Sequence, residues 1–159
     1  MFVSYIEKSR DYYAAQGFTT AYRWAAYPDV PFADLRKPVA EARIGLVTTA
    51  GLMDSDHAHD RAFDWHSVYA APIDPPPARL FTDNRFWDKA ATHTDDLDSF
   101  APIHRLQEFA AAGRIGSLSP RFYGIPTEYS QRKTNETDSP ALLECCREDE
   151  VDAAILVAL

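Results

Sequence analysis

Three polar residues in the middle of the chain have the side-chain types and the spacing needed for proton transfer. His93, Asp95 and Asp96 lie together in a polar stretch that precedes an apolar segment. A histidine gains or loses a proton near neutral pH, and a carboxylate beside it can fix which ring nitrogen carries that proton. A catalytic role is therefore one hypothesis for this trio. The alternative is that Asp95, or the nearby Asp98, only helps to start the next helix.

A second set of residues is suited to holding a small-molecule substrate. Thr48, Thr49 and Gly51 come at the end of the first apolar run, where hydroxyl and backbone N–H groups can face a ligand. The alternative is that the threonines only cap a turn. Arg105 is a candidate for binding a substrate carboxylate, although an exposed helix face is the alternative there. We expect His104, next to it, to be structural.

Metal and thiol chemistry have weaker support in the sequence. His57 and His59 have the His-x-His spacing that metal sites use in extended segments, but no Cys or Glu motif completes a site. We therefore expect no bound metal, and a metal-dependent hydrolase is the least favoured hypothesis. Cys145 and Cys146 are adjacent, so on a helix they point in different directions, and we expect Cys146 to belong to the core.

The elements that must position these candidates are short strands and helices. Residues 42–49 form an apolar run with β-branched residues, typical of a buried strand that leads into a turn. A helix is predicted after Ser99, which can cap it, with Gly113 as its end. A second helix is predicted from Asp138 or Ser139 to about residue 149, with Leu142, Leu143 and Cys146 pointing inward. Residues 151–159 then read as a buried strand.

The remaining segments are less regular. Capping-box spacing between Ser4 and Glu7 predicts a helix over about residues 5–16, and an irregular, proline-containing arm follows to residue 39. Residues 68–80 favour a polyproline-like extension, residues 115–118 a very short strand, and residues 121–135 a turn-rich stretch. We therefore predict one α/β domain over residues 1–159, with a helix and arm in residues 1–40 and a core in residues 41–159. The core is expected to be a three-layer, Rossmann-like fold with a short, mostly parallel sheet and an incomplete C-terminal helix–strand unit.

Composition and charge restrict the function. The chain has 159 residues, 46% of them hydrophobic, and a net charge of −8. An acidic chain with no basic cluster argues against a nucleic-acid partner. No apolar segment approaches the roughly 20 residues that span a bilayer, and the first residues lack the features of a signal peptide. We expect a cytoplasmic protein without a membrane partner, and a homo-oligomer remains open.

Three segments in order resemble the selenoprotein B family of glycine, betaine, sarcosine and D-proline reductases, particularly its short bacterial relatives. They are ARIGLVTTAGL (42–52), THTDDLDSFAPIHRLQEFAAAGRIGSLSPRFYG (92–124) and EDEVDAAILVAL (148–159). The second segment is the most specific, and it contains the His-x-Asp-Asp cluster, so the resemblance favours the catalytic role for His93, Asp95 and Asp96. The resemblance covers about residues 42–159.

The resemblance implies where a reactive group is found. In that family, the strand matching VDAAILVAL leads into a selenocysteine or cysteine, usually followed by Pro-x-Cys. We expect a selenocysteine just after Leu159, read as a stop codon in this sequence, so that the chain as given lacks its nucleophile. The family cleaves a C–N bond of a small-molecule substrate reductively, and a thioredoxin-like dithiol supplies the electrons. No other cofactor is implied. The alternative to an oxidoreductase is a non-catalytic ligand-binding or regulatory α/β module.

Overall fold

The computed structural model describes residues 4–21, 23, 25–31, 33–52, 67–81, 95–127 and 130–158. The chain divides into two compact units, Met1–Phe32 and Ala33–Leu159. Among the described residues, no helix has the length and apolar character needed to cross a membrane.

The first unit contains one helix, α1 (Tyr5–Ala15), within one residue of the predicted range. Ser4 occupies the N-cap position, but its side chain makes no capping hydrogen bond. Gly17 follows the helix with a φ of 93°, a left-handed conformation that favours glycine. Helix α1 has no buried residue, so its tyrosines contribute to no core.

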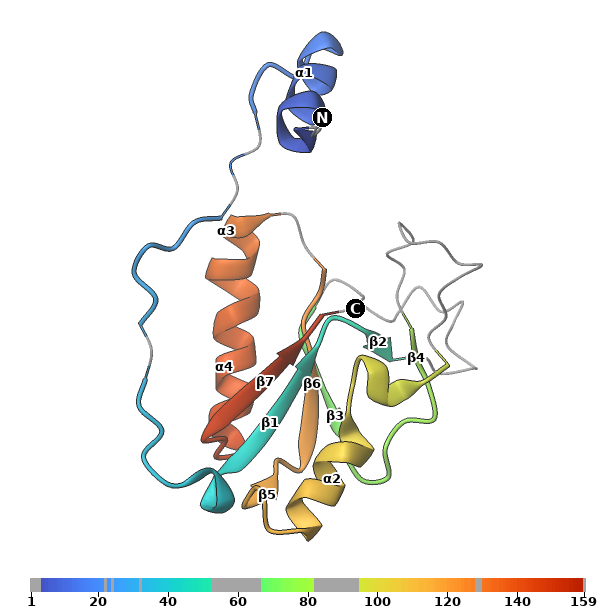
Figure 1. Ribbon diagram of the computed structural model, residues 1–159, viewed down its shortest axis with the longest axis vertical. Coiled ribbons are helices and arrows are strands. Elements are labelled where there is room, and N and C mark those ends of the chain that lie inside the picture. The colour runs from blue at the N-terminus through green and yellow to red at the C-terminus, as the bar shows by residue number, and fades with distance from the viewer. Residues whose placement is uncertain are drawn as a thin grey trace. The chain divides into compact units, whose positions relative to one another are not determined.

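The second unit is built on a small, mostly parallel sheet, as predicted (Figure 1). Its strands are β1 (Arg43–Thr48), β3 (Tyr69–Pro72), β5 (Ser117–Leu118), β6 (Arg121–Gly124) and β7 (Ala153–Val157). Strand β1 pairs in parallel with β7 along one side and with β5 and then β6 along the other, because Ile44 and Val47 each have a partner on both sides. Strand β3 runs antiparallel to β6. A separate two-stranded sheet joins β2 (Gly51–Leu52) to β4 (Leu80–Phe81).

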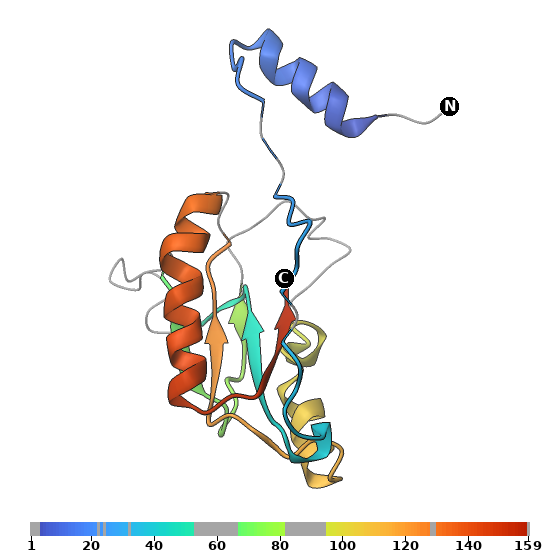
Figure 2. The ribbon, with the colours of Figure 1, turned by 90° about the vertical axis from the view of Figure 1, so that its left-hand side faces the viewer.

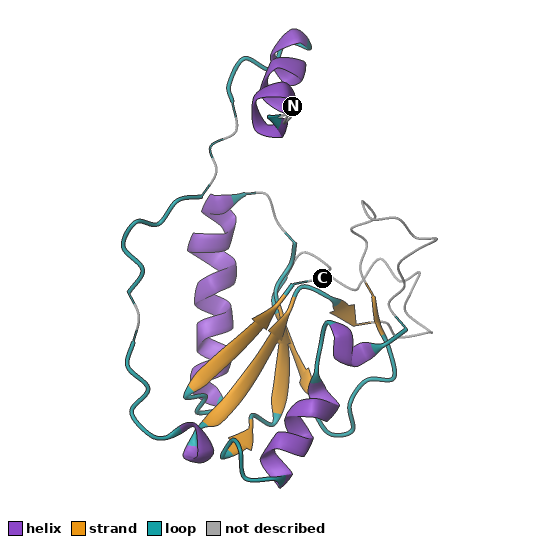
Figure 3. Cartoon of the chain, viewed as in Figure 1, coloured by secondary structure: helices purple, strands orange, loops and turns teal. Residues whose placement is uncertain are grey.

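Helices cover both faces of the sheet, which gives the expected three layers (Figures 2 and 3). One layer contains α2 (Ile103–Ala111), preceded by the 3₁₀ turn η2 (Leu97–Ser99). The other is a continuous helical run made of α3 (Gln131–Lys133), the π-helical turn η3 (Thr134–Asp138) and α4 (Ser139–Glu148). A further 3₁₀ turn, η1 (Val39–Glu41), leads into β1.

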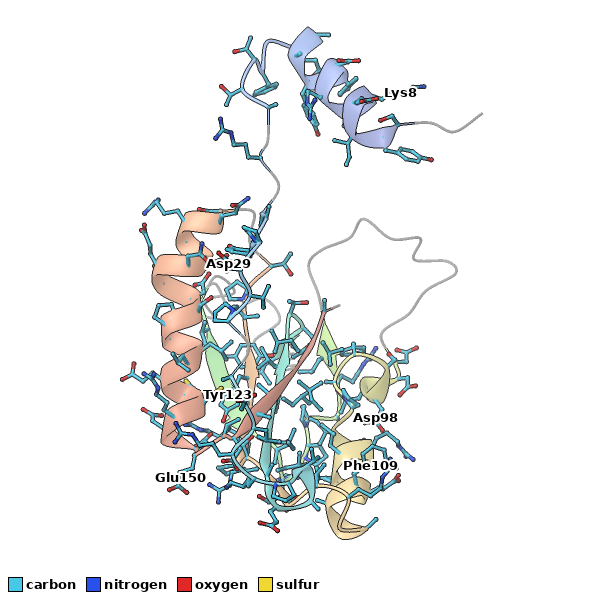
Figure 4. The ribbon with its side chains drawn as sticks, turned by 60° about the vertical axis from the view of Figure 1, so that its left-hand side comes forward. Lys8, Asp29, Asp98, Phe109, Tyr123 and Glu150 are labelled. Carbon is cyan, nitrogen blue, oxygen red and sulfur yellow. The ribbon has the colours of Figure 1, made fainter. Side chains whose placement is uncertain are left out.

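The main core lies between the sheet and α2. Leu46 and Phe122 from the sheet pack in one cluster with Ile103 and Leu106 from α2 and with Phe100. All five are 5% exposed or less. Because side chains alternate along a strand, Val47 lies on the opposite face from Leu46. Tyr123 also points away from this core, towards α4 (Figure 4). Burial of this apolar area is the main stabilising contribution to the fold.

Several local predictions were wrong. Strand β7 forms where predicted but at the margin of the sheet, and its Leu156 is 73% exposed. On α4, Leu143 is 48% exposed instead of pointing inward. The helical run is capped by Ser130, whose Oγ accepts a hydrogen bond from the Lys133 N–H at 3.2 Å, and not by Asp138 or Ser139.

The stretches predicted to be irregular also contain regular elements. Strands β3 and β4 lie in or beside the proline-containing region, and β6 and α3 lie in the region predicted to be turn-rich. Ser99 does not cap α2, which begins after Pro102. Asp98 takes that role, because its Oδ1 accepts a hydrogen bond from the His104 N–H at 3.0 Å.

Candidate functional site

The carboxyl ends of three parallel strands lie at one edge of the sheet. The register places Thr48 of β1 opposite Gly124 of β6 on one side and opposite Val157 of β7 on the other. Loops and helix starts that follow parallel strands meet at such an edge, which is where open α/β sheets bind ligands. We therefore take this edge as the candidate site.

Thr48 connects the end of β1 to the segment before α2. Its side chain is buried, its Oγ1 donates a hydrogen bond to the Phe100 carbonyl at 3.2 Å, and the same oxygen accepts one from the Ala50 N–H at 3.2 Å. The hydroxyl is therefore hydrogen-bonded to two backbone groups, one as donor and one as acceptor. This geometry favours the turn-capping alternative for Thr48. Thr49 and Gly51 are only partly buried beside it.

Part of the predicted catalytic trio lies in the same region. The Thr48–Phe100 hydrogen bond joins the end of β1 to the segment that carries Asp96. Asp96 caps η2, since its Oδ1 accepts a hydrogen bond from the Asp98 N–H at 3.1 Å. Asp95 forms an exposed ion pair with Arg79 at 2.9 Å. His93 lies outside the described residues, so its geometry relative to these carboxylates stays a prediction.

Asp98 organises the start of α2 more extensively than the sequence indicated. Its side chain is 18% exposed and its Oδ2 lies 3.3 Å from Nδ1 of His104 and 3.4 Å from Nε of Arg105 (Figure 4). Arg105 also pairs with Glu108 at 2.8 Å, and its side chain is 60% exposed. This arrangement favours the exposed-helix-face alternative for Arg105, which is not brought into contact with Thr48 by any described hydrogen bond.

Asp138 is a candidate that the sequence did not identify as functional. It is 2% exposed, and its Oδ2 has no hydrogen-bond partner. A buried carboxylate oxygen that accepts no hydrogen bond from the protein is costly, and it calls for an explanation. Asp138 also ends the π-helical turn η3, a type of irregularity frequent at functional sites. The helical run that contains it begins after β6, at the carboxyl edge (Figure 1).

The opposite edge of the sheet contains an ion-pair network that is well satisfied. Arg121 donates from Nε to Oδ2 of Asp149 at 2.8 Å and from Nη2 to Oδ1 at 3.0 Å, and Tyr123 Oη donates to the same carboxylate at 2.6 Å. These contacts, led by the hydrogen bonds from Arg121, lower the pKa of Asp149. Arg43 Nη1 donates to the Asp149 carbonyl at 2.8 Å. The network ties the turn before β7 to β1 and β6, which is a structural role.

The two cysteines are poorly suited to act as nucleophiles. Both thiols are partly buried and unpaired, and burial raises the pKa of Cys145 and of Cys146. A raised pKa reduces the thiolate fraction at neutral pH, and the thiolate is the reactive species. Any thiol or selenol chemistry at this fold therefore needs a different residue.

No metal centre is present in the part of the chain that the structure describes, where no three His, Cys, Asp or Glu side chains gather closely enough to hold an ion. His57 and His59, whose spacing raised the metal-site hypothesis, lie outside the described residues. Comparison of the chain with protein-family models, with curated proteins and with solved structures found no match.

Proposed function

We propose that this chain is the scaffold of a selenol- or thiol-dependent oxidoreductase of the glycine, betaine, sarcosine and D-proline reductase type, acting on a small molecule at the carboxyl edge of its sheet. The observation that supports it best is the parallel pairing of β7 with β1, which aligns Val157 with Thr48. A residue carried directly after β7 would then lie beside the Thr48–Gly51 turn. In the family that the sequence resembles, the reactive selenocysteine or cysteine follows the matching strand.

The chemistry at this position follows from general principles. A selenolate or thiolate is stabilised at the N-terminus of a following helix, because the backbone N–H groups there are positive. A second cysteine two residues later can resolve an adduct on the first by forming a mixed bond. We propose that the catalytic group follows the strand that matches the family pattern, and that a thioredoxin-like dithiol is the reductant.

The test is to determine the gene sequence downstream of the Leu159 codon and to label an extended protein. We expect a UGA codon followed by codons for Pro-x-Cys. In a version with cysteine at that codon, iodoacetamide should label the new residue at least about tenfold faster than Cys145 or Cys146 at pH 7, because only the new thiol has a lowered pKa. The 159-residue chain is the control. An in-frame UAA or UAG codon, or faster labelling of the Cys145–Cys146 pair, would reject the proposal.

A second candidate function, a non-catalytic ligand-binding module, is favoured by Asp138 alone. The Oδ2 atom of this buried carboxylate has no hydrogen-bond partner and could pair with a cationic nitrogen of a ligand. Asp138→Asn should then raise the free energy of unfolding by about 1–3 kcal/mol, because an amide is less costly to bury without a partner than a carboxylate. The matched change Asp149→Asn should lower it, because Asp149 is fully paired.

The ligand-binding readout for this second candidate is a thermal shift. Millimolar methylammonium should raise the melting temperature of the wild type and not that of Asp138→Asn. If Asp138→Asn is destabilising, or if both proteins respond equally to methylammonium, Asp138 does not hold a cationic ligand and this candidate fails.

A further inference from the structure

The first turn of α2 contains a histidine that one carboxylate contacts twice. Oδ1 of Asp98 accepts a hydrogen bond from the His104 backbone N–H at 3.0 Å, and Oδ2 of the same carboxylate lies 3.3 Å from Nδ1 of the imidazole. A carboxylate beside Nδ1 favours the tautomer with its proton on that atom, so Nε2 is left as the proton acceptor. The side chain of His104 is 49% exposed and that of Asp98 is 18% exposed. The imidazole can therefore exchange protons, while the group that orients it is largely shielded from water.

Buried contacts fix the start of α2 at the carboxyl edge of the sheet. Thr48, at the end of β1, donates from Oγ1 to the Phe100 carbonyl at 3.2 Å. Phe100 and Ile103 belong to the core cluster, and Val157, at the end of β7, packs against that cluster. His104 directly follows Ile103, which is fully buried. Its place relative to the ends of β1 and β7 is therefore determined by packed side chains, as a group in a functional site requires.

We propose that His104 is the proton acceptor for the thiol or selenol that the proposed function places after β7, with Asp98 as its positioning residue. This inference rests on the proposed function. A nucleophile of this kind is activated by an adjacent base that a third group orients. The S–H or Se–H bond of the nucleophile breaks, and its proton bonds to Nε2 of His104. The resulting imidazolium faces the Asp98 carboxylate, which stabilises its positive charge.

The same proton is needed later in the proposed reaction. When the C–N bond of the substrate breaks, its electron pair stays with nitrogen, and Nε2 of the imidazolium gives its proton to that nitrogen. His104 then returns to the neutral form with its remaining proton on Nδ1, facing Asp98. Arg105 cannot replace it, although its Nε lies 3.4 Å from the same Asp98 oxygen, because a guanidinium keeps its protons in proteins.

The experiment uses the extended protein with cysteine at the recoded codon, labelled with iodoacetamide at pH 7. His104→Gln should slow the labelling of the new cysteine about five- to tenfold, because its thiolate loses the imidazolium partner. The exposed side chain of His104 makes the variant compatible with folding. The matched control is Arg114→Gln, which removes an exposed positive charge just beyond the other end of α2. It should change the labelling rate less than about twofold, because charges at a distance are screened.

Asp98→Asn separates a positioning role from simple electrostatics. The amide keeps an oxygen that can accept the His104 N–H, but the negative charge is gone. Electrostatics alone predicts faster labelling of the new cysteine, because a negative charge near its thiolate has been removed. The proposed role predicts labelling that is about threefold slower or more, because the imidazolium loses the group that orients and stabilises it.

Nuclear magnetic resonance of the 159-residue chain with isotope-labelled histidine gives a readout that needs no nucleophile. Where His104 is neutral, its proton should be on Nδ1 in the wild type, and Asp98→Asn should lose this preference.

Three results overturn the inference and leave the proposed function standing. They are a wild-type His104 with its proton on Nε2, fast labelling of the new cysteine that His104→Gln does not slow, and faster labelling in Asp98→Asn. Slow labelling of the new cysteine in the otherwise unchanged extended protein rejects the proposed function itself, and the inference is rejected with it.

Discussion

Two aspartates on either side of α4 illustrate how differently a carboxylate can be placed in one small domain. Asp149 accepts hydrogen bonds from Arg121 and Tyr123, so its charge is fully compensated. Asp138 is more deeply buried, and its Oδ2 has no partner. The first is explained by stability alone. The second is not, and this contrast makes Asp138 a functional candidate.

The pairing of Asp149 makes the stability of the protein dependent on pH. The pKa of this carboxyl is lowered from its ordinary value of 3.8, first by the hydrogen bonds from Arg121. A group whose pKa is lower in the folded state stabilises the protein fully above its unfolded pKa, and that contribution is lost as the pH falls through the folded pKa. We therefore expect the free energy of unfolding to decrease below about pH 4.

Arg121→Gln tests this dependence. It should lower the free energy of unfolding at pH 7 by about 1.5–3 kcal/mol, since it removes hydrogen bonds to a charged group, and it should flatten the loss below pH 4. Urea unfolding at pH 7, 4 and 3 measures both effects. The control is Arg105→Gln, whose ion pairs are more exposed and should contribute less than about 1 kcal/mol. Equal slopes below pH 4 in wild type and Arg121→Gln would contradict the assignment.

At the scale of elements, the end of β6 is held in place by a close approach between backbone and ring. Gly124 pairs with Thr48 on one side and with Tyr69 on the other. A Cβ atom at Gly124 would overlap the Tyr69 ring. Tyr69 is itself fixed, because its Oη donates to the Ala50 carbonyl at 2.5 Å and its ring packs edge-on against Phe122. Burial also raises the pKa of the Tyr69 hydroxyl, which keeps it a donor.

Gly124→Ala should therefore destabilise the protein by about 1–3 kcal/mol, the usual cost of overpacking. The change should cost clearly less in a Tyr69→Leu background, because the smaller side chain leaves room for the added methyl group. Denaturant unfolding of the two single variants and the double variant measures the coupling. Strict additivity of the two changes would show that the Tyr69 ring is not what excludes a side chain at position 124.

Some helices and strands were predictable from local sequence patterns, and others were not. Strand β1 and helix α1 were predicted within a residue or two, because apolar runs, caps and glycines are local signals. Strand β6 was missed because it is short and has polar neighbours. The prediction that β7 is buried was wrong. Burial of a strand depends on which strands lie beside it, and the partner β1 is more than 100 residues away in the chain.

The candidate site was predictable only in part, for the same reason. The end of β1 and the Asp96 segment were identified, and their connection through Thr48 and Phe100 is consistent with a shared region. From the sequence, Asp138 was interpreted as a helix cap. No local pattern shows that one oxygen of its carboxylate is buried without a hydrogen-bond partner. Such isolation is a property of the packed molecule, here of a helical run that begins at Gln131, seven residues earlier.

At the scale of the whole molecule, the main hydrophobic core is formed by the second unit, Ala33–Leu159. Helix α1 buries no side chain, and its rings contact one another and Phe18, as in the Tyr13–Phe18 pair at 6.2 Å between centroids. The second unit contains every member of the main core cluster. The stability of the sheet should therefore not depend on residues Met1–Phe32.

Deletion of Met1–Phe32 should change the free energy of unfolding by less than about 0.5 kcal/mol, because none of the described residues in this range is buried. Urea unfolding followed by near-ultraviolet circular dichroism would measure it. The matched control is a deletion that extends through Glu41 and should cost more than about 2 kcal/mol. It removes the Val39 carbonyl that accepts a hydrogen bond from the Gly116 N–H at 3.2 Å, and it removes the Lys37–Asp152 ion pair. If the shorter deletion proves as damaging as the longer one, the first unit supplies part of the core, and the sheet is not the self-sufficient body that its packing indicates.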